Sequence, residues 1–476
     1  MTSNSFVGRC HELEILANAW NSRDPELIAV YGRRRVGKTE LIRKGRDAHG
    51  FFVEFTGQRD ATVNVQLLNF RNALSKALGI TIQQPRNWTE AFSLLTNAIE
   101  TRASSFKCMT LFFDEVSWLD SRRSGFLNAL EYFWNHVASQ NHKVKVVACG
   151  SSAAWVIKKI VQGKGGWHRR VTRKIHVKPF TLSEAAAFLK SRNLKYSHRD
   201  IIKLYAILGG IPYYLKMIDQ GESLETLVER LLFGENAILR NEFSELFKSL
   251  FNNASEHQKI VETLAKRKSG YTRREISELS TIASGGGLSS YIENLEYSDF
   301  ITAYLPLGAN SKKETHYRLS DLFSLFYLKW IGRAKRTTWQ SVIVSQAYKS
   351  WMGYAFEIIA WNHAEQLASY LGLKRIPWEA TKAELTEDEE MAKIDLIIDV
   401  KGGSLYLIEL KFYDHAYTIT KTEAAHIERR RRVLAKHFNG NRSVITCLLA
   451  PQGVNESQIN ANIIDKFLPS DVLFEA

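Results

Sequence analysis

Short apolar runs alternate with amphipathic stretches through the first 180 or so residues. The runs lie at 27–31, 51–55, 109–113, 144–149 and 174–177. Each has the length of a buried strand, and the segments between them carry helical spacing. Strands separated by helices are typical of a parallel α/β sheet. The pattern therefore predicts an α/β domain over residues 1–180.

The hydrophobic pattern becomes helical after that point. Residues 181–249 are predicted as a helical lid, interrupted at Gly209, Gly210 and Pro212, as helix ends require. Between 250 and 335, three helical segments precede two short apolar runs, and the triple glycine 285–287 comes before the third helix. Three helices followed by a hairpin predict a winged helix.

The last predicted domain covers residues 336–476. A long helical stretch, 339–371, leads into it, and an acidic loop at 384–390 precedes two strands, 394–399 and 405–412. The expected fold class is thus a multidomain α/β protein. It consists of a parallel sheet with a helical lid, a winged helix and a C-terminal α/β domain.

Composition limits the possible classes of protein. The length of 476 residues argues for about three domains. The formal charge of +14 suits an anionic partner, most commonly nucleic acid, although a merely soluble basic protein is the alternative. The four cysteines lie too far apart for a disulfide scaffold or a zinc ribbon. No signal-peptide pattern opens the chain and no apolar run reaches the length of a membrane span, so we expect a cytoplasmic protein.

The clearest motif is GRRRVGKT, which fits the phosphate-loop pattern GxxxxGK[ST] between an apolar run and a helix. Its glycines allow backbone amides to curl around a phosphate, and the helix N-terminus adds positive charge. Lys38 is predicted to reach the β- and γ-phosphates of ATP, and Thr39 to offer its hydroxyl to Mg²⁺. The predicted nucleotide-binding residues here are Gly32, Arg33, Arg34, Arg35, Val36, Gly37, Lys38, Thr39 and Glu40.

Two carboxylates end the apolar run at 109–113. Asp114 is predicted to hold Mg²⁺, and Glu115 to polarise the attacking water as general base. The run at 144–149 leads to Ser151 and Ser152, either of which could sense the γ-phosphate, with a helix N-cap as the alternative role. Residues 158–178 contain eight Lys or Arg and no acid. An arginine finger, a nucleic-acid patch and a solvated loop remain open for Arg169, Arg170 and Arg173.

Together FVGR (6–9), GRRRVGKT, LFFDE, CGSS and GIP (210–212) resemble the archaeal and bacterial ATPase family of the STAND branch of AAA+-related P-loop NTPases. The resemblance covers residues 1 to about 330. It implies that Phe6, Val7 and Arg9 lie near the adenine, that Pro212 contacts the nucleotide from the lid, and that a winged helix follows. It also implies a slow ATP-driven switch that often forms oligomers.

The second set of candidate residues lies in the last domain. If a hairpin turn is centred on Gly402, Asp395 falls opposite Glu409, and Lys411 shares their face because it lies two residues further along the strand. Two close carboxylates need a cation, and Mg²⁺ or Mn²⁺ fits an all-oxygen site. Glu357, on an apolar helical stripe, is the possible third ligand.

This arrangement resembles the PD-(D/E)xK nuclease superfamily, in particular the C-terminal domain found on some archaeal-type ATPases. The resemblance covers about residues 340–476 and departs from the pattern in having Ile394 rather than proline before Asp395. It implies catalytic roles for Glu357, Asp395, Glu409 and Lys411. The other interpretations are an inactive nuclease fold that binds nucleic acid or a partner, and a salt-bridged structural hairpin. The run of four arginines at 429–432 is predicted to contact a nucleic-acid backbone.

Two functions follow from these motifs. The first is an ATPase, with Glu115 as its base, that controls a Mg²⁺- or Mn²⁺-dependent nuclease acting on nucleic acid, with DNA as the expected substrate. The second is an ATP-dependent switch that binds DNA or a partner through an inactive nuclease fold. Neither requires a membrane, and both allow an ATP-linked homo-oligomer.

Overall fold

The protein is described by a computed structural model that covers residues 6–163, 165–332, 338–387, 389–455 and 462–475. It divides into two compact units, Met1–Lys178 and Pro179–Ala476.

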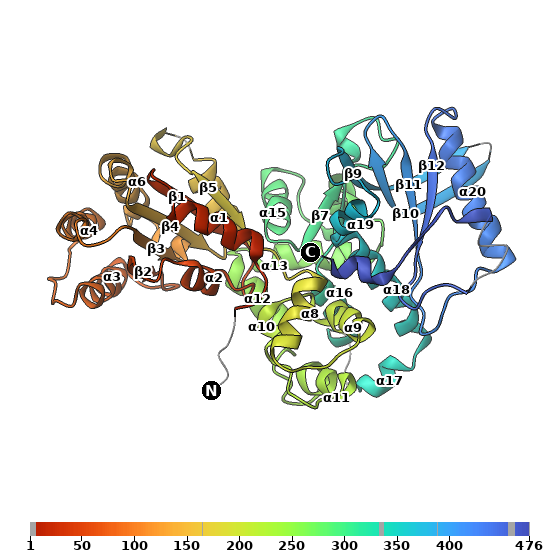
Figure 1. The fold of residues 1–476 in the computed structure, drawn as a ribbon, viewed down its shortest axis with the longest axis horizontal. Coiled ribbons are helices and arrows are strands. Elements are labelled where there is room, and N and C mark those ends of the chain that lie inside the picture. Colours follow the sequence, from red (N-terminus) through yellow and green to blue (C-terminus); the bar gives the residue numbers. More distant parts are fainter. Residues whose placement is uncertain (1–5, 164, 333–337, 388, 456–461, 476) are drawn as a thin grey trace. The chain divides into compact units, whose positions relative to one another are not determined.

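The first unit is built on a parallel five-stranded sheet with the strand order β2-β3-β4-β1-β5 (Figure 1). All five strands that the apolar runs predict are present. Their bounds are β1 (Glu26–Tyr31), β2 (Phe51–Thr56), β3 (Met109–Asp114), β4 (Val144–Gly150) and β5 (Arg173–His176). Every residue of β3 and β4 is buried, as expected of parallel strands covered on both faces.

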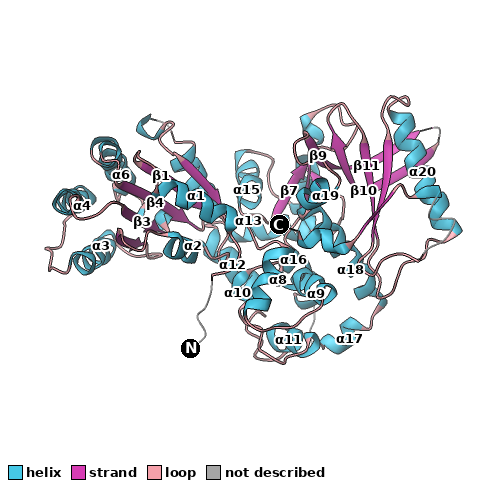
Figure 2. Ribbon diagram, viewed as in Figure 1, coloured by secondary structure: helices cyan, strands magenta, loops and turns pink. Residues whose placement is uncertain are grey.

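Helices cover both faces of this sheet (Figure 2). They are α1 (Cys10–Trp20), α2 (Lys38–Gly45), α3 (Val63–Leu78), α4 (Trp88–Arg102), α5 (Val116–Leu119), α6 (Phe126–His136) and α7 (Ala153–Val156). One face is packed by α3, α4 and α6, whose Phe70, Phe92 and Phe133 join the strands in a single apolar core. This core fixes the strands, and hence the loops that leave their carboxyl ends.

The second unit begins with the helices predicted as a lid. They are α8 (Leu182–Ser191), α9 (His198–Leu208), α10 (Pro212–Leu215), α11 (Leu224–Val228) and α12 (Glu242–Leu250). A capping box between Thr181 and Glu184 starts α8, which satisfies amides that the first helical turn leaves free. Gly209 ends α9 in the left-handed conformation, and Pro212 opens α10, as the sequence predicts.

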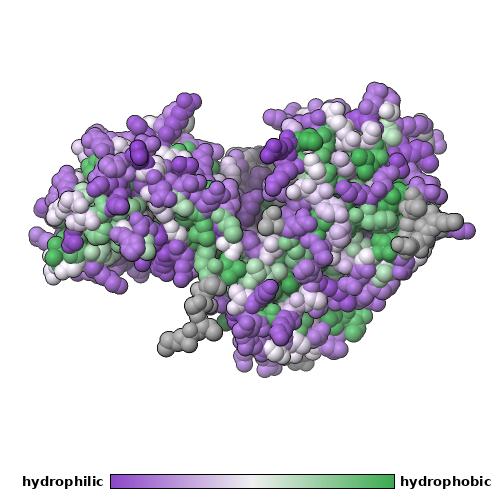
Figure 3. Space-filling model, in the orientation of Figure 1, coloured by the Kyte–Doolittle hydropathy of each residue, from purple (hydrophilic) through white to green (hydrophobic). Residues whose placement is uncertain are grey.

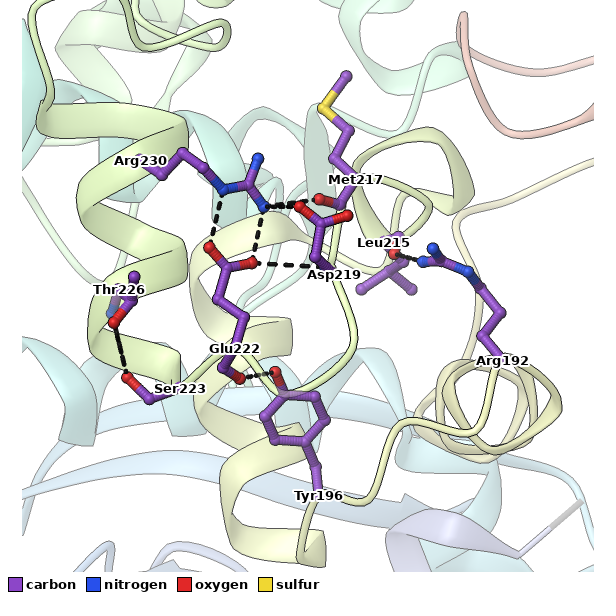
Figure 4. Close-up of polar contacts among 9 residues, drawn as sticks. All are labelled: Arg192, Tyr196, Leu215, Met217, Asp219, Glu222, Ser223, Thr226 and Arg230. Atoms are coloured by element: carbon purple, nitrogen blue, oxygen red, sulfur yellow. Dashed lines mark hydrogen bonds and ion pairs between the residues drawn. The ribbon is translucent and has the colours of Figure 1, made fainter.

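A polar clamp holds the chain that leaves α10 (Figure 4). Arg230 donates two hydrogen bonds to the Glu222 carboxylate, both 2.7 Å, and one to the carbonyl of Met217. Its guanidinium lowers the pKa of Glu222 chiefly through this hydrogen bonding. Arg192 donates to the carbonyl of Leu215, the last residue of α10. The clamp therefore fixes the short helix that begins with Pro212.

Residues 254–319 form a compact module of three helices and a small sheet. The helices are α13 (Ala254–Leu264), α14 (Arg273–Ser280) and α15 (Gly286–Tyr297). The antiparallel sheet has the order β6-β8-β7, with β6 (Tyr271–Thr272), β7 (Ile301–Tyr304) and β8 (His316–Leu319). The three predicted helices and both strands of the predicted hairpin are present. The two-residue β6 is too short for its pattern to be read from the sequence.

The stretch 339–371, expected as one long helix, is three helices instead. They are α17 (Trp339–Ile343), α18 (Gln346–Asn362) and α19 (Ala364–Tyr370), and they follow α16 (Leu322–Phe326). The breaks occur at Ser345, which caps α18 by accepting a hydrogen bond from the amide of Tyr348, and at His363. Both breaks depend on local hydrogen bonds that the apolar spacing alone does not reveal.

The C-terminal sheet has the order β13-β12-β11-β10-β9. Its strands are β9 (Trp378–Glu387), β10 (Glu390–Val400), β11 (Leu405–Leu410), β12 (Val444–Leu449) and β13 (Lys466–Leu468), with α20 (Lys421–His437) between β11 and β12. The expected acidic loop at 384–390 is wrong, because β9 reaches Glu387 and β10 begins at Glu390. The acidic residues of β9 are compatible with a strand because Glu384 forms an ion pair, 2.9 Å long, with Lys393 directly opposite it on β10.

Hairpin β10–β11 has the register that a turn centred on Gly402 predicts, with Ile397 opposite Leu407 and Asp399 opposite Leu405. The pairing of β10 with β9, however, shifts between Ile394 and Ile397, which marks a β-bulge. A bulge places an extra residue in one strand and so changes which face the following side chains occupy. This irregularity decides where Asp395 points.

The surface of the first unit drawn in Figure 3 is mainly hydrophilic, with small apolar patches between the polar side chains. Among the residues that the structure describes, no helix combines the length and the apolar character needed to cross a lipid bilayer.

Candidate functional site

The loop between β1 and α2 forms a phosphate cradle at the carboxyl end of the sheet. Gly32 has φ +144°, and a Cβ there would lie 2.2 Å from the carbonyl oxygen of Val177. Gly37 has φ +91°, and α2 begins directly after it. Both conformations favour glycine. The loop thus ends at the N-terminus of α2, the kind of position at which an anion is stabilised.

Lys38 lies inside this cradle and is only 5% exposed. Its Nζ donates to the carbonyl oxygens of Gly32 (3.0 Å) and Arg33 (2.9 Å), and to Oγ of Ser151 (2.9 Å). All three contacts satisfy the ammonium group without an anion. A phosphate that enters the loop can take over these contacts, because the amine is already positioned in the cradle.

Thr39 and Asp114 form the second feature of the loop. The Thr39 hydroxyl donates to Oδ2 of Asp114 at 2.7 Å, across a separation of 75 residues in sequence. Burial raises the pKa of Asp114, the hydrogen bond from Thr39 opposes this shift, and the charge of Glu115 adds to it. A hydroxyl and a carboxylate at a phosphate loop are oxygen ligands of the kind that Mg²⁺ takes together with substrate phosphates.

Glu115 occupies a strained position immediately after β3, with φ +47°. Its carboxylate accepts the hydroxyl of Ser151 at 2.6 Å and the amide of Ser151 at 3.1 Å. Non-glycine residues in the left-handed region cluster at functional sites. Because Ser151 contacts both Lys38 and Glu115, it links the phosphate-loop lysine to the candidate general base. Of the two serines that the sequence offered, Ser151 makes these contacts, and Ser152 directly precedes α7.

The remaining predicted loop residues divide by exposure. Arg33 and Val36 are buried, Arg35 is half-buried with φ +73°, and Arg34 and Glu40 are exposed. Arg9 is 4% exposed and donates a hydrogen bond to the carbonyl of Val36 at 3.0 Å. The FVGR segment therefore helps to hold the phosphate loop in place.

Some residues carried over from the family resemblance keep their roles as predictions. Phe6 and Val7 are half-buried just before Arg9, and Pro212 lies in the second unit. Among the arginine-finger candidates, Arg173 is paired with Glu26 at 3.3 Å, whereas Arg169 and Arg170 are exposed. Arg173 is thus engaged within its own sheet.

Residues 6–218 match the sequence profile of a family described as an ATPase domain predominantly from Archaea. The second unit thus contributes its first helices to the match. This chain carries an ATPase domain of the archaeal type.

Two curated relatives come from Methanocaldococcus jannaschii. An uncharacterized protein is 24% identical over 386 residues, which is 79% of this chain and 80% of the relative. An uncharacterized ATP-binding protein is 59% identical over 39 residues, 8% of this chain and 66% of the relative. Among solved structures, the Walker-type ATPase of Pyrococcus abyssi aligns with a TM-score of 0.50 at 17% identity, covering 69% of this chain and 97% of the other. At that identity the likeness shows the fold alone.

The carboxylates predicted for the C-terminal domain do not lie together. Glu409 faces α20, where Arg430 donates to its Oε1 at 2.7 Å, and it follows Leu405 and Leu407 on the face that packs against Leu434. Asp395 is paired instead with Lys382 of β9, 3.5 Å away. The expected meeting of Asp395 and Glu409 on one face is wrong.

The bulge in β10 is the physical reason. Ile394 and Ile397 both belong to the apolar core beneath α20, although a regular strand would place residues three apart on opposite faces. Asp395 therefore lies on the other side of the sheet from Glu409. There it is close enough to Glu357 of α18 for its charge to raise the pKa of that carboxyl, in addition to the larger effect of burial.

Each separated group has partners that the sequence did not suggest. Lys411 lies 3.4 Å from Glu423 in the first turn of α20, and Glu357 accepts from Lys268 at 3.1 Å. Lys382 was missed because strand β9 was not predicted, although its segment TKAELT alternates in the way a strand does. No cluster of three acidic, histidine or cysteine side chains that could hold a metal occurs within the described ranges.

Three of the four arginines at 429–432, on α20, form ion pairs with other parts of the chain. Arg430 pairs with Glu409, Arg431 with Asp465 at 3.6 Å, and Arg432 with Glu390 at 2.7 Å. The prediction that this run is a nucleic-acid contact does not anticipate these three ion pairs. The partners come from β10, β11 and the loop before β13, all remote in sequence.

Proposed function

We propose that this protein binds ATP at residues 32–39 and hydrolyses it to ADP and phosphate. The observation that carries the proposal is the convergence of Lys38, the Thr39–Asp114 pair and Glu115 at the carboxyl ends of β1, β3 and β4. Ligands of open α/β sheets bind at this edge. The archaeal-type ATPase domain over residues 6–218 agrees with the assignment.

In the proposed reaction Lys38 and the loop amides hold the β- and γ-phosphates. Glu115 accepts a proton from water as the water oxygen bonds to the γ-phosphorus, and the bond from that phosphorus to the bridging oxygen breaks, releasing ADP. Thr39 and Asp114 would hold Mg²⁺, which when bound neutralises charge on the phosphate oxygens. Ser151 releases Glu115 and Lys38 before either can act, which favours slow turnover.

The lysine of the loop provides the first test. Lys38→Ala removes the amine that balances the phosphate charge, so ATP binding should weaken at least tenfold, roughly 1.4 kcal/mol. Lys44→Ala is the matched control, since Lys44 is an exposed lysine on the same helix. Isothermal titration with ATP and Mg²⁺ measures both affinities. Equal affinities for Lys38→Ala and Lys44→Ala would remove the loop from the proposal.

The proposed base provides a second, independent test. Glu115→Gln keeps the shape of the side chain but cannot accept the proton, so it should retain ATP binding and lose hydrolysis by about a hundredfold or more. Phosphate release under saturating ATP measures the rate. A variant that hydrolyses ATP at the wild-type rate contradicts the role of Glu115 and leaves the binding assignment intact.

For the second unit, we propose an ATP-dependent switch that binds DNA or a partner through a winged-helix module at 254–319 and the C-terminal domain. The specific observation that favours a switch over a nuclease is the separation of Asp395 from Glu409 by the β10 bulge. Each of these carboxylates is already paired with a cation. A nuclease of the predicted kind needs both carboxylates on one metal ion.

A cleavage panel distinguishes the two functions. Single- and double-stranded DNA and RNA are incubated with the full chain in Mg²⁺ or Mn²⁺, with and without ATP. The switch predicts no cleavage beyond that of a Lys411→Ala variant. Cleavage that disappears in Asp395→Ala and in Lys411→Ala would restore the nuclease and reject the switch.

Nucleic acid remains the proposed anionic partner, supported by the net charge of +14. Helix α15 is a poor groove reader, because Gly286–Tyr297 contains two glutamates and no Lys or Arg. Exposed positive charge lies instead at Arg169 and Arg170. Affinity for a duplex should fall with rising salt, and Arg169→Gln/Arg170→Gln should reduce that salt dependence. A salt slope unchanged by the double variant would exclude this segment.

A further inference from the structure

A cleft of about 950 Å³ lies inside the second unit, far along the chain from the phosphate loop. Its walls come from α12, α13, the helical turn that follows α16, and α18. Cavities of roughly 300–1,000 Å³ are typical of sites for small molecules and cofactors. The cleft therefore has the size of a ligand site, and none of the residues assigned to ATP binding lines it.

Positive charge dominates the lining of this cleft. Lys266, Lys268 and Lys329 contribute ammonium groups, and Glu262 is the acidic residue among the lining side chains. Lys266 and Lys329 are exposed, and neither has an acidic partner within 4 Å in the part of the chain that the structure describes. Their charges are thus available to an anion that enters the cleft.

Aromatic side chains also line the cleft. Trp351 and Tyr354 project from α18 into the lining, and Tyr327 joins them from the turn after α16. The indole Nε1 of Trp351 is buried and has no acceptor among the described residues. Flat rings next to lysines suit a ligand that combines a planar ring with negative charge.

Lys268 connects the cleft to the C-terminal domain. Its Nζ lies 3.1 Å from Oε1 of Glu357 and 5.0 Å from the centre of the Tyr354 ring. The other carboxylate oxygen of Glu357 is buried without a hydrogen-bond partner among the described residues. Lys268 is half exposed, so this amine is held from one side and remains accessible from the cleft.

We propose that this cleft binds a nucleotide, with its phosphate on Lys266, Lys268 and Lys329 and its base against Tyr327 and Trp351. The shared chemistry, a planar base and a phosphate monoester, is offered by a free mononucleotide and by the 5′-phosphorylated end of a nucleic-acid strand. The site is separate from the ATP loop, so the inference goes beyond the proposed ATPase function and does not depend on it.

The test uses the full chain carrying Lys38→Ala, so that the phosphate loop contributes as little as possible. Isothermal titration is performed with AMP, with a 5′-phosphorylated thymidine tetranucleotide, with the same tetranucleotide lacking the phosphate, and with inorganic phosphate. Each is repeated after adding Lys266→Gln/Lys329→Gln. The control is Lys259→Gln, a lysine of α13 that pairs with Glu256 and does not line the cleft.

The proposal expects AMP or the phosphorylated tetranucleotide to bind at least tenfold more weakly to Lys266→Gln/Lys329→Gln than to Lys259→Gln. Preference between these two ligands identifies the source of the nucleotide. Unchanged thermal unfolding of the double variant shows that the cleft remains folded. No binding of any probe at millimolar concentration, or equal binding by the double variant and the control, overturns the proposal. ATP binding by the Lys38→Ala protein that survives the addition of Lys266→Gln/Lys329→Gln would count against the phosphate-loop assignment, whereas the comparison between this double variant and Lys259→Gln would still stand.

Discussion

His363 makes the structure of the second unit sensitive to pH. It is 1% exposed at the junction of α18 and α19. Its Nδ1 donates to the carbonyl of Ile359 (2.7 Å), and its Nε2 accepts a hydrogen bond from the amide of Leu182 (2.9 Å), the first residue of α8. Nε2 can accept only in the neutral ring. Burial accordingly lowers the pKa of His363 to about 4.

The sign of the effect follows from proton linkage. The unfolded chain, with a histidine pKa of about 6.5, takes up the proton before the folded chain does, so stability falls as pH decreases from about 6.5 toward 4. The full difference of about 2.5 pKa units corresponds to roughly 3 kcal/mol at about 1.4 kcal/mol per unit. At pH 5 the expected loss is about 2 kcal/mol, because the folded ring is still mostly neutral there.

Amide hydrogen exchange can measure this loss of stability at the first turn of α8 itself. The opening free energy of the first turn of α8 is compared at pH 7.5 and pH 5 in the wild type, in His363→Gln and in the control His426→Gln, whose side chain is exposed on α20. The wild type and the control should lose about 2 kcal/mol more than His363→Gln between these values. Burial also lowers the pKa of His257, and the difference between variants cancels that contribution. Equal pH dependence in all three proteins would refute the reasoning.

Three further predictions concern single contacts. Ser151→Ala frees the amine of Lys38 and the carboxylate of Glu115, so ADP should bind more tightly, by up to about tenfold; weaker ADP binding in titration calorimetry would count against the role of Ser151. Gly32→Ala should lower the unfolding midpoint strongly, since its Cβ meets a carbonyl oxygen at 2.2 Å, whereas Gly285→Ala, with open space around it, should not. Glu409→Gln strips the part-buried Arg430 of its partner and should cost about 1–2 kcal/mol in denaturant unfolding; no loss would mean that the pair is not formed.

The first unit could be predicted from the sequence because its signals are local. Each buried parallel strand appears as a continuous apolar run, and the loop at 32–39 carries its chemistry within eight consecutive residues. The position of Asp114 follows for the same reason, since it directly ends a buried strand. Even the contact of Ser151 with Lys38 follows from neighbouring strands ending at one edge of the sheet.

The C-terminal site could not be predicted in the same way. The hairpin register was correct, because it depends on the turn at Gly402. The side of the sheet that Asp395 occupies depends on a bulge opposite β9, and no residue type in β10 announces it. A single added residue reverses the face of an aspartate while leaving the turn and the β10–β11 pairing next to it unchanged.

The ion pairs of the arginine run could not be predicted for a related reason. The sequence shows that a run of residues is positively charged, but it does not show whether the folded chain brings acidic side chains next to that run. In α20 the helical period distributes Arg430, Arg431 and Arg432 around the axis, and each finds a carboxylate from a different segment. Because Glu409 forms an ion pair with Arg430, one of the two carboxylates predicted to bind a metal ion already has a cationic partner. Two features that separately indicate a nuclease, the arginine run and the strand carboxylate, are thus paired with each other in the folded chain.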